Sequence, residues 1–200
     1  EMKSKNVTFY AGVPCSFLTP LINYVINEKS LTYISAANEG DAISIAAGAA
    51  IGGVSSVAIM QNSGLGNAIS PLTSLTYTFK IPLLIICTHR GAPNLTDEPQ
   101  HELMGKITSK LFETIGIPVA RFPTKAQNIN TTIETALANM NESGLPQALI
   151  MEKGSVAPCM LEDQTAPIIA TNQRFIEELS HANLLTRYEV LKKLVQATNA

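Results

Sequence analysis

Two kinds of apolar pattern alternate along this chain. Short continuous runs rich in branched aliphatic residues, such as Leu83-Leu84-Ile85-Ile86-Cys87, are typical of strands that are buried on both faces. Between these runs, apolar residues recur every three or four positions, which predicts helices. The predicted strands cover residues 7–11, 31–36, 56–61, 83–88, 119–122 and 148–152. The predicted helices cover residues 14–28, 39–52, 65–77, 103–115 and 125–141, with Pro14 in the first turn of the first one.

This regular alternation predicts an α/β fold with a doubly wound, mainly parallel sheet of about six strands and helices on both faces. The predicted domain covers residues 1–155. Residues 156–200 are expected to form a connector, with two prolines and no clear periodicity, and then a terminal amphipathic helix that begins with a capping box from Thr186 to Glu189. This helix either folds back on its own domain or continues into a longer protein.

Composition narrows the classes of protein. The chain has 200 residues, of which 46% are apolar and 15% charged, as expected for a well-filled core. A net charge of −2 without a basic cluster argues against nucleic-acid binding. The apolar runs are too short to span a membrane and no signal peptide is recognisable, so we expect a cytoplasmic protein without membrane contact. Three cysteines without CxxC spacing argue against a disulfide framework and against a zinc site.

Glu39 is the most informative candidate for chemistry. It lies where a strand-like run meets a helix made almost entirely of small residues, and no Lys or Arg is near it in sequence. Because a buried carboxylate needs a partner, Glu39 is expected to pair with a cation or to hydrogen-bond a ligand. The alternative is an exposed carboxylate that the dipole of the helix stabilises.

The loops that follow the first four strands are expected to meet at one edge of the sheet, where open α/β folds bind ligands. Gly64-Leu65-Gly66 follows a strand and opens a helix, as in a dinucleotide fingerprint, but the third glycine is missing. No phosphate-binding loop of the GxxxxGK[ST] type is present.

Four segments together carry a family resemblance: Gly12-Val13-Pro14, Asn38-Glu39-Gly40-Asp41-Ala42, Met60-Gln61-Asn62-Ser63-Gly64-Leu65-Gly66-Asn67 and Asp97-Glu98-Pro99-Gln100-His101. The chain resembles the pyrimidine-binding domain of phosphonopyruvate decarboxylases, which are thiamine-diphosphate enzymes, over residues 7–155. The resemblance implies decarboxylation of 3-phosphonopyruvate to phosphonoacetaldehyde in phosphonate synthesis. It also implies that the Glu39 carboxyl shares a proton with the aminopyrimidine ring and thereby activates C2 of the cofactor.

The same resemblance assigns further residues. Asn62, Ser63 and Gly64 are implied to bind the cofactor together with Glu39. Candidates for holding the anionic substrate are Ser16, Cys15, Arg90 and His101. Cys15 stands where an acidic residue is common in the family, so a proton-transfer role is in doubt there. Alternative interpretations are a hydrogen-bonded loop histidine for His101 and an ion pair for Arg90.

The family's motif for diphosphate and Mg²⁺, Gly-Asp-Gly followed by a distant Asn, is not found in this sequence. The resemblance therefore implies that Mg²⁺ and the diphosphate are bound by a domain outside this chain, contributed by a partner chain in a homo-oligomer. We expect the subunit contact to involve the helices predicted at 39–52 and 65–77. The chain is then part of a longer enzyme or resembles the small subunit of sulfopyruvate decarboxylase. Two further alternatives are a non-catalytic α/β domain that has lost its cofactor and a nucleotide-binding domain.

Overall fold

The structure is a computed structural model, and it describes residues 1–162 and 185–198. The chain divides into two compact units, Glu1–Asp163 and Gln164–Ala200, and each is described by itself.

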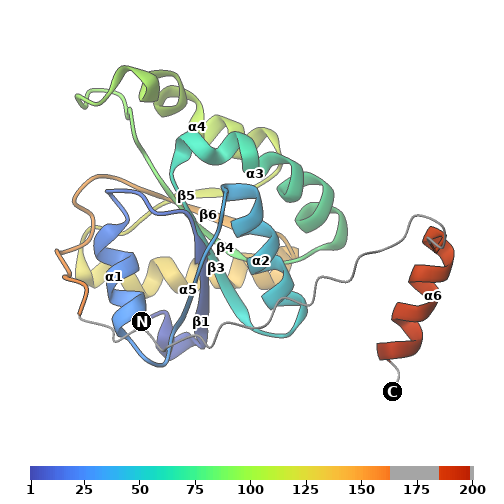
Figure 1. The fold of residues 1–200 in the computed structure, drawn as a ribbon. Helices are drawn as coiled ribbons and strands as arrows, with labels where there is room; N and C mark the ends of the chain where they lie inside the picture. Colours follow the sequence, from blue (N-terminus) through green and yellow to red (C-terminus); the bar gives the residue numbers. More distant parts are fainter. Residues whose placement is uncertain (163–184, 199–200) are drawn as a thin grey trace. The chain divides into compact units, whose positions relative to one another are not determined.

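A six-stranded sheet forms the centre of the first unit (Figure 1). Its strands are β1 (Val7–Gly12), β2 (Thr32–Ser35), β3 (Ser55–Met60), β4 (Leu84–Thr88), β5 (Val119–Arg121) and β6 (Gln147–Met151). They are ordered β2-β1-β3-β4-β6-β5, and all five neighbouring pairs are parallel. The chain winds outward in both directions from β1, which confirms the predicted doubly wound sheet.

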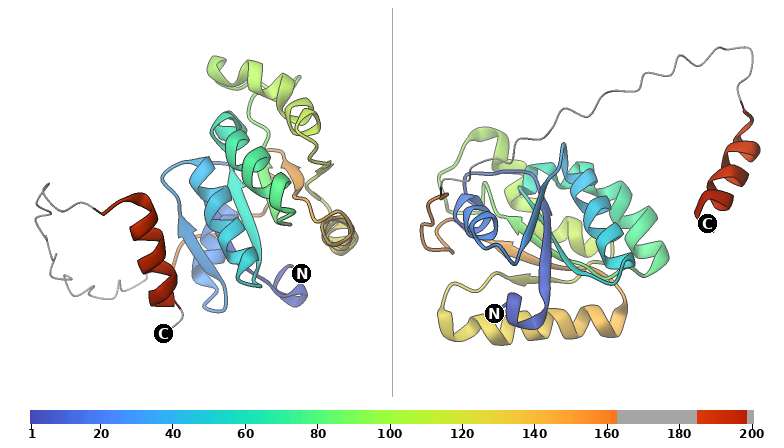
Figure 2. Two further views of the ribbon diagram at one scale, coloured as in Figure 1. Left: turned by 90° about the vertical axis from the view of Figure 1, so that its right-hand side faces the viewer. Right: turned by 60° about the horizontal axis from the view of Figure 1, so that its bottom comes forward.

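Helices cover both faces of this sheet (Figure 2). Their bounds are α1 (Thr19–Asn27), α2 (Glu39–Ile51), α3 (Leu65–Pro71), α4 (Glu102–Thr114) and α5 (Ala126–Ser143). One core packs under α1 and α5, and the other under α2, α3 and α4. Strand β4 contributes to both cores because its side chains alternate between the two faces of the sheet. Leu84 and Ile86 pack in the core under α1 and α5, and Ile85 and Cys87 pack in the core under α2, α3 and α4.

The first helix begins later than expected, at Thr19 rather than Pro14. Residues before it form a turn in which the amides of Leu18 and Thr19 bond to the carbonyl of Cys15, at 2.9 and 3.0 Å. The reason is Pro20, which occupies the first turn of α1. A helix that began at Pro14 would hold this proline in its interior, where the missing N–H and the ring would break it.

The helix predicted over residues 65–77 is also divided. The α-helical part α3 ends at Pro71, and residues Leu72–Tyr77 continue as a π-helix. Pro71 cannot donate to the carbonyl of Asn67, so the regular hydrogen-bond ladder is interrupted at this point. The burial pattern of α2 shows which of its residues can take part in the predicted subunit contact. Ala46 and Ala47 are fully buried in the core, so the α2 residues that face outward include Ser44 and Gly48.

The described part of the predicted connector lies along α1. Asn23 donates to the carbonyl of Cys159 and Asn27 to that of Met160, both at 2.8 Å, and the amide of Glu162 donates back to Asn27 at 3.0 Å. Residues 163–184 of this segment lie outside the described ranges.

In the second unit, α6 (Arg187–Thr198) begins with the expected capping box. Thr186 and Glu189 exchange hydrogen bonds of 2.7 and 3.3 Å. No helix in the two described stretches combines the length and apolar character needed to cross a membrane.

Candidate functional site

The loops that carry the candidate residues leave the carboxyl ends of β1, β2, β3 and β4. Strand β1 is the point at which the direction of winding reverses, since β2 lies on one side of it and β3 on the other. Such a switch point is where open α/β sheets bind ligands. The fold therefore gathers the predicted residues at one edge of the sheet.

Glu39 is the first residue of α2, and the helix start is fixed by the residue before it. Asn38 caps the helix by accepting from the amide of Asp41 at 3.1 Å, and its side-chain amide donates to the Asp41 carboxylate at 2.8 Å. The Glu39 side chain is only 9% exposed. The alternative of an exposed carboxylate does not describe this geometry.

The Glu39 carboxyl lies in a notch between Gly64 and Asn67. The side-chain amide of Asn67 donates to Oε2 at 2.9 Å. A Cβ atom at Gly64 would lie 1.9 Å from the carboxyl carbon and 2.0 Å from Oε1, so only glycine leaves room for the carboxyl here. No Lys or Arg of the described residues forms an ion pair with Glu39. Its partner is a neutral amide, and Oε1 receives no hydrogen bond from any described residue.

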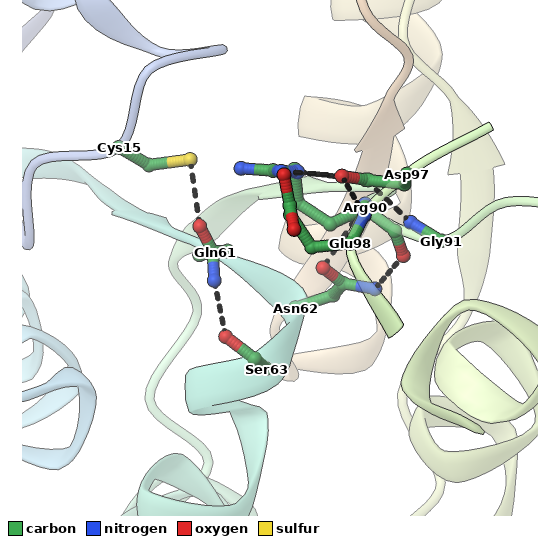
Figure 3. A network of polar contacts seen from close by, with 8 residues as sticks. All are labelled: Cys15, Gln61, Asn62, Ser63, Arg90, Gly91, Asp97 and Glu98. Atoms are coloured by element: carbon green, nitrogen blue, oxygen red, sulfur yellow. Dashed lines mark hydrogen bonds and ion pairs between the residues drawn. The ribbon is translucent and has the colours of Figure 1, made fainter. Parts of the chain in front are cut away.

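Gln61 connects the loops after β1 and β3 (Figure 3). The thiol of Cys15 donates to Oε1 of Gln61 at 3.1 Å, and Nε2 of Gln61 donates to the hydroxyl of Ser63. Cys15 is buried, whereas Ser16 and Ser63 are exposed. The hydroxyls of these two serines are thus placed where a ligand can reach them, and their predicted roles stay predictions.

The side chain of Asn62 joins neighbouring segments of the fold, and its predicted contact with a cofactor stays a prediction. Its side chain is fully buried. Oδ1 accepts from the amide of Arg90 at 3.1 Å, and Nδ2 donates to the Arg90 carbonyl at 2.8 Å and to the Thr108 hydroxyl at 3.0 Å. The side chain therefore ties the loop after β3 to the loop after β4 and to α4. Only the backbone of Asn62 is left for the predicted contact with a cofactor.

Arg90 forms an ion pair, as one of the two interpretations of this residue predicted. Its guanidinium donates to both carboxylate oxygens of Asp97, and the Nε–Oδ2 distance is 2.7 Å. The hydrogen bond from Arg90, with bonds from the amides of Gly91 and Glu98, holds the pKa of Asp97 well below its usual range. Both groups stay charged at neutral pH and neutralise each other. Whether Arg90 also contacts substrate stays a prediction.

Arg90 also reaches the loop after β1. Its guanidinium lies over the ring of Phe17, 4.7 Å from the ring centre. The stacking and the ion pair together connect the loop after β1 with the segment Asp97–His101. Arg90 therefore holds these two segments next to each other at the edge of the site.

His101 is 7% exposed, and its Nδ1 atom has no hydrogen-bond partner among the described residues. At this atom, the described residues give no support to the alternative interpretation of a hydrogen-bonded loop histidine. The backbone around it is tightly packed: Gly91, at φ +66°, approaches the His101 carbonyl so closely that a Cβ there would lie 2.1 Å from the oxygen. Contact with substrate stays a prediction for this residue.

Three contacts of the site were not anticipated from the sequence: those of Gln61, Asn67 and Asp97. All three residues lie in the segments that carry the family resemblance. Their partners are known only from the structure, because the contacts join residues from 7 to 46 positions apart.

Comparisons with known proteins agree with this geometry. The family described as "Thiamine pyrophosphate enzyme, N-terminal TPP binding domain" matches residues 1–110. A solved structure of a putative thiamin diphosphate-dependent enzyme from Mycobacterium smegmatis has the same fold, with a TM-score of 0.58 and 17% identity, covering 82% of this chain and 32% of that one. The chain belongs to the thiamine pyrophosphate enzyme family, and residues 1–110 match the N-terminal domain of that family.

Within this family, two relatives are informative. A phosphonopyruvate decarboxylase of Streptomyces viridochromogenes is 41% identical over 191 residues, which are 94% of this chain and 48% of that protein. A sulfopyruvate decarboxylase subunit alpha of Methanocaldococcus jannaschii is 34% identical over 152 residues, 76% of this chain and 88% of the subunit. This chain thus spans about half the length of that phosphonopyruvate decarboxylase and most of the length of the alpha subunit.

Proposed function

We propose that this chain binds the aminopyrimidine part of thiamine diphosphate and contributes Glu39 to the decarboxylation of 3-phosphonopyruvate, which gives phosphonoacetaldehyde and CO₂. The observation that carries the proposal is the buried Glu39 carboxyl, held by a neutral amide in a notch that a Cβ at Gly64 would fill. Such a carboxyl is free to hydrogen-bond a ring nitrogen and to exchange a proton with it. The family match and the phosphonopyruvate decarboxylase relatives support the assignment.

The cofactor, when bound, supplies an electron sink for the carbon–carbon bond that breaks. The residues of this chain bind and orient. Glu39 holds and moves a proton at its carboxyl, and Gly64 permits the close approach. Ser63 lies exposed beside the notch, and Ser16 with the start of α1 is our candidate for the anionic group of the substrate. Cys15 reaches this region through Gln61, and Arg90 with Asp97 organises the loops around it.

Mg²⁺ and the diphosphate are assigned in this proposal to a domain of a partner chain. Within residues 1–162 and 185–198, no three His, Cys, Asp or Glu side chains are placed together to hold a metal ion. We propose a cytoplasmic homo-oligomer in which residues 1–155 are the pyrimidine-binding domain and residues 156–200 lead toward the diphosphate-binding half. We call this chain, joined to or assembled with the diphosphate-binding half, the complete enzyme.

The substrate is tested by assaying the complete enzyme with 3-phosphonopyruvate, sulfopyruvate and pyruvate in parallel. We expect thiamine diphosphate and Mg²⁺ to be required, and kcat/KM for 3-phosphonopyruvate to exceed that for pyruvate by at least about 100-fold, since unpaired polar groups in the site penalise the smaller keto acid. Preference for sulfopyruvate would favour the second candidate function, that of a sulfopyruvate decarboxylase alpha subunit. This candidate is supported by the match to 88% of the length of such a subunit. Absence of cofactor binding would instead indicate a non-catalytic domain.

Self-association is tested on the outer face of α2. Gly48 faces solvent, and among the described residues no atom beyond its chain neighbours and its own helix backbone lies within 4 Å of the position its Cβ would take. If α2 and α3 form a close subunit contact, Gly48→Lys should place a charge in it and dissociate the oligomer. Sedimentation at micromolar concentration measures the change. The matched control is Ala138→Lys, at an exposed position on α5. An unchanged oligomer in Gly48→Lys would place the contact elsewhere.

A further inference from the structure

A hydrogen bond joins Asn67, in α3, to Glu39, the first residue of α2. We propose that Asn67 is a positioning residue for Glu39, whose side-chain amide fixes one carboxyl oxygen so that the other is presented to the ligand. The inference rests on the proposed function, because it takes Glu39 to be the group that contacts the aminopyrimidine ring.

The two carboxyl oxygens of Glu39 have different surroundings. Oε2 accepts from Nδ2 of Asn67 at 2.9 Å, while Oε1 lies against Gly64 without a protein donor among the described residues. The Asn67 backbone is itself held by α2, since a Cβ at Gly40 would lie only 2.7 Å from the Asn67 carbonyl oxygen. The start of α3 therefore lies directly against the start of α2, and the side chain of the exposed Asn67 reaches Glu39 from there. Oxygen Oε1 is the one that stays available.

The chemistry of the partner matters as much as its position. A Lys or Arg at residue 67 would hold Glu39 as a permanently ionised carboxylate and would weaken its exchange of a proton with a ligand. An Asp there would place two negative charges together and disfavour ionisation of Glu39. A neutral amide orients the carboxyl without placing a full charge beside it, and therefore influences its ionisation less than a Lys, Arg or Asp would. Asparagine on this turn thus suits a group that must share a proton.

The test compares three substitutions in the complete enzyme by the rate at which the C2 proton of the bound cofactor exchanges with deuterium. Asn67→Leu removes the donor at similar volume, and exchange should slow at least about tenfold, the effect of one lost hydrogen bond to a charged group. Asn67→Asp should shift the pH profile of exchange to higher pH. Asn67→Gln keeps the amide and should recover part of the rate.

Two further measurements separate positioning from a structural effect. The dissociation constant of thiamine diphosphate should change less than about threefold in Asn67→Leu, because the contact orients Glu39 rather than binding the cofactor. The control is Asn141→Leu, the same change at an exposed position near the end of α5, which should leave exchange and affinity unaltered. An equal loss in both variants, or a loss of affinity that accounts for the slower exchange, would overturn the proposal.

A readout without cofactor completes the test. In the cofactor-free protein, Glu39→Gln should shift the Nδ2 resonance of Asn67, because it replaces the carboxylate oxygen that accepts from this amide at 2.9 Å. A resonance insensitive to Glu39 would overturn the contact. If Glu39→Gln slows exchange but Asn67→Leu does not, the proposed function stands and the role of Asn67 falls. If neither variant slows exchange, the proposed function itself falls.

Discussion

Replacing Glu39 by Gln in the complete enzyme should slow exchange of the cofactor's C2 proton by at least about 100-fold, the usual contribution of a positioned acid–base group. Glutamine has the same shape and can still accept from Asn67, so the notch is expected to persist. What is lost is the proton that the carboxyl shares with the ring. Acid-quenched samples analysed by nuclear magnetic resonance give the exchange rate directly.

The same variant should bind thiamine diphosphate with an affinity within about tenfold of the wild type, because a neutral side chain can still hydrogen-bond the ring. Its unfolding temperature should not fall, since no ion pair of Glu39 with a described residue is broken. Wild-type exchange in Glu39→Gln would remove Glu39 from the chemistry.

The general architecture could be predicted because it depends on local patterns. The continuous apolar strands require cover on both faces, and the alternation of strands and helices leaves few topologies. All six predicted strands and five helices are present, with most boundaries within one or two residues. The start of α1 was wrong because Pro14 and Pro20 each satisfy the preference for proline in a first turn, and only Pro20 is compatible with the rest of the helix.

The site was predictable only in part. The position of Glu39, between a strand and a helix of small residues, indicated a buried carboxyl, and the structure shows one. The hydrogen bonds of Asn62 could not be read from the sequence, because Thr108 lies 46 residues away on α4. The sequence allowed an ion pair for Arg90 without naming Asp97, since the fold of the loop decides which carboxylate it meets.

Substituting Gly64 by Ala is expected to remove activity while leaving the fold intact. The added methyl group would overlap the Glu39 carboxyl, with 1.9 Å to its carbon. The displaced atoms are the end of a side chain rather than backbone, so Glu39 can move aside, and we expect a loss of stability no greater than about 1–3 kcal/mol. A displaced carboxyl no longer meets the ring, and C2 exchange should fall about 100-fold, as in Glu39→Gln.

Gly66, two residues along the chain, provides the matched control, because no other part of the described structure, outside its own helix turn, lies within 4 Å of the position its Cβ would take. Gly66→Ala should keep the wild-type exchange rate and raise the stability of α3 by about 0.5–1 kcal/mol, as alanine is the better helix former. The double variant Gly64→Ala with Glu39→Gln decides the mechanism. If the methyl group acts by displacing Glu39, the two effects should not add, and exchange in the double variant should stay within about threefold of that in Glu39→Gln. If the two losses multiply in the double variant, Gly64 serves the reaction independently of Glu39. If Gly64→Ala exchanges the C2 proton at the wild-type rate, the notch is not the site of the chemistry.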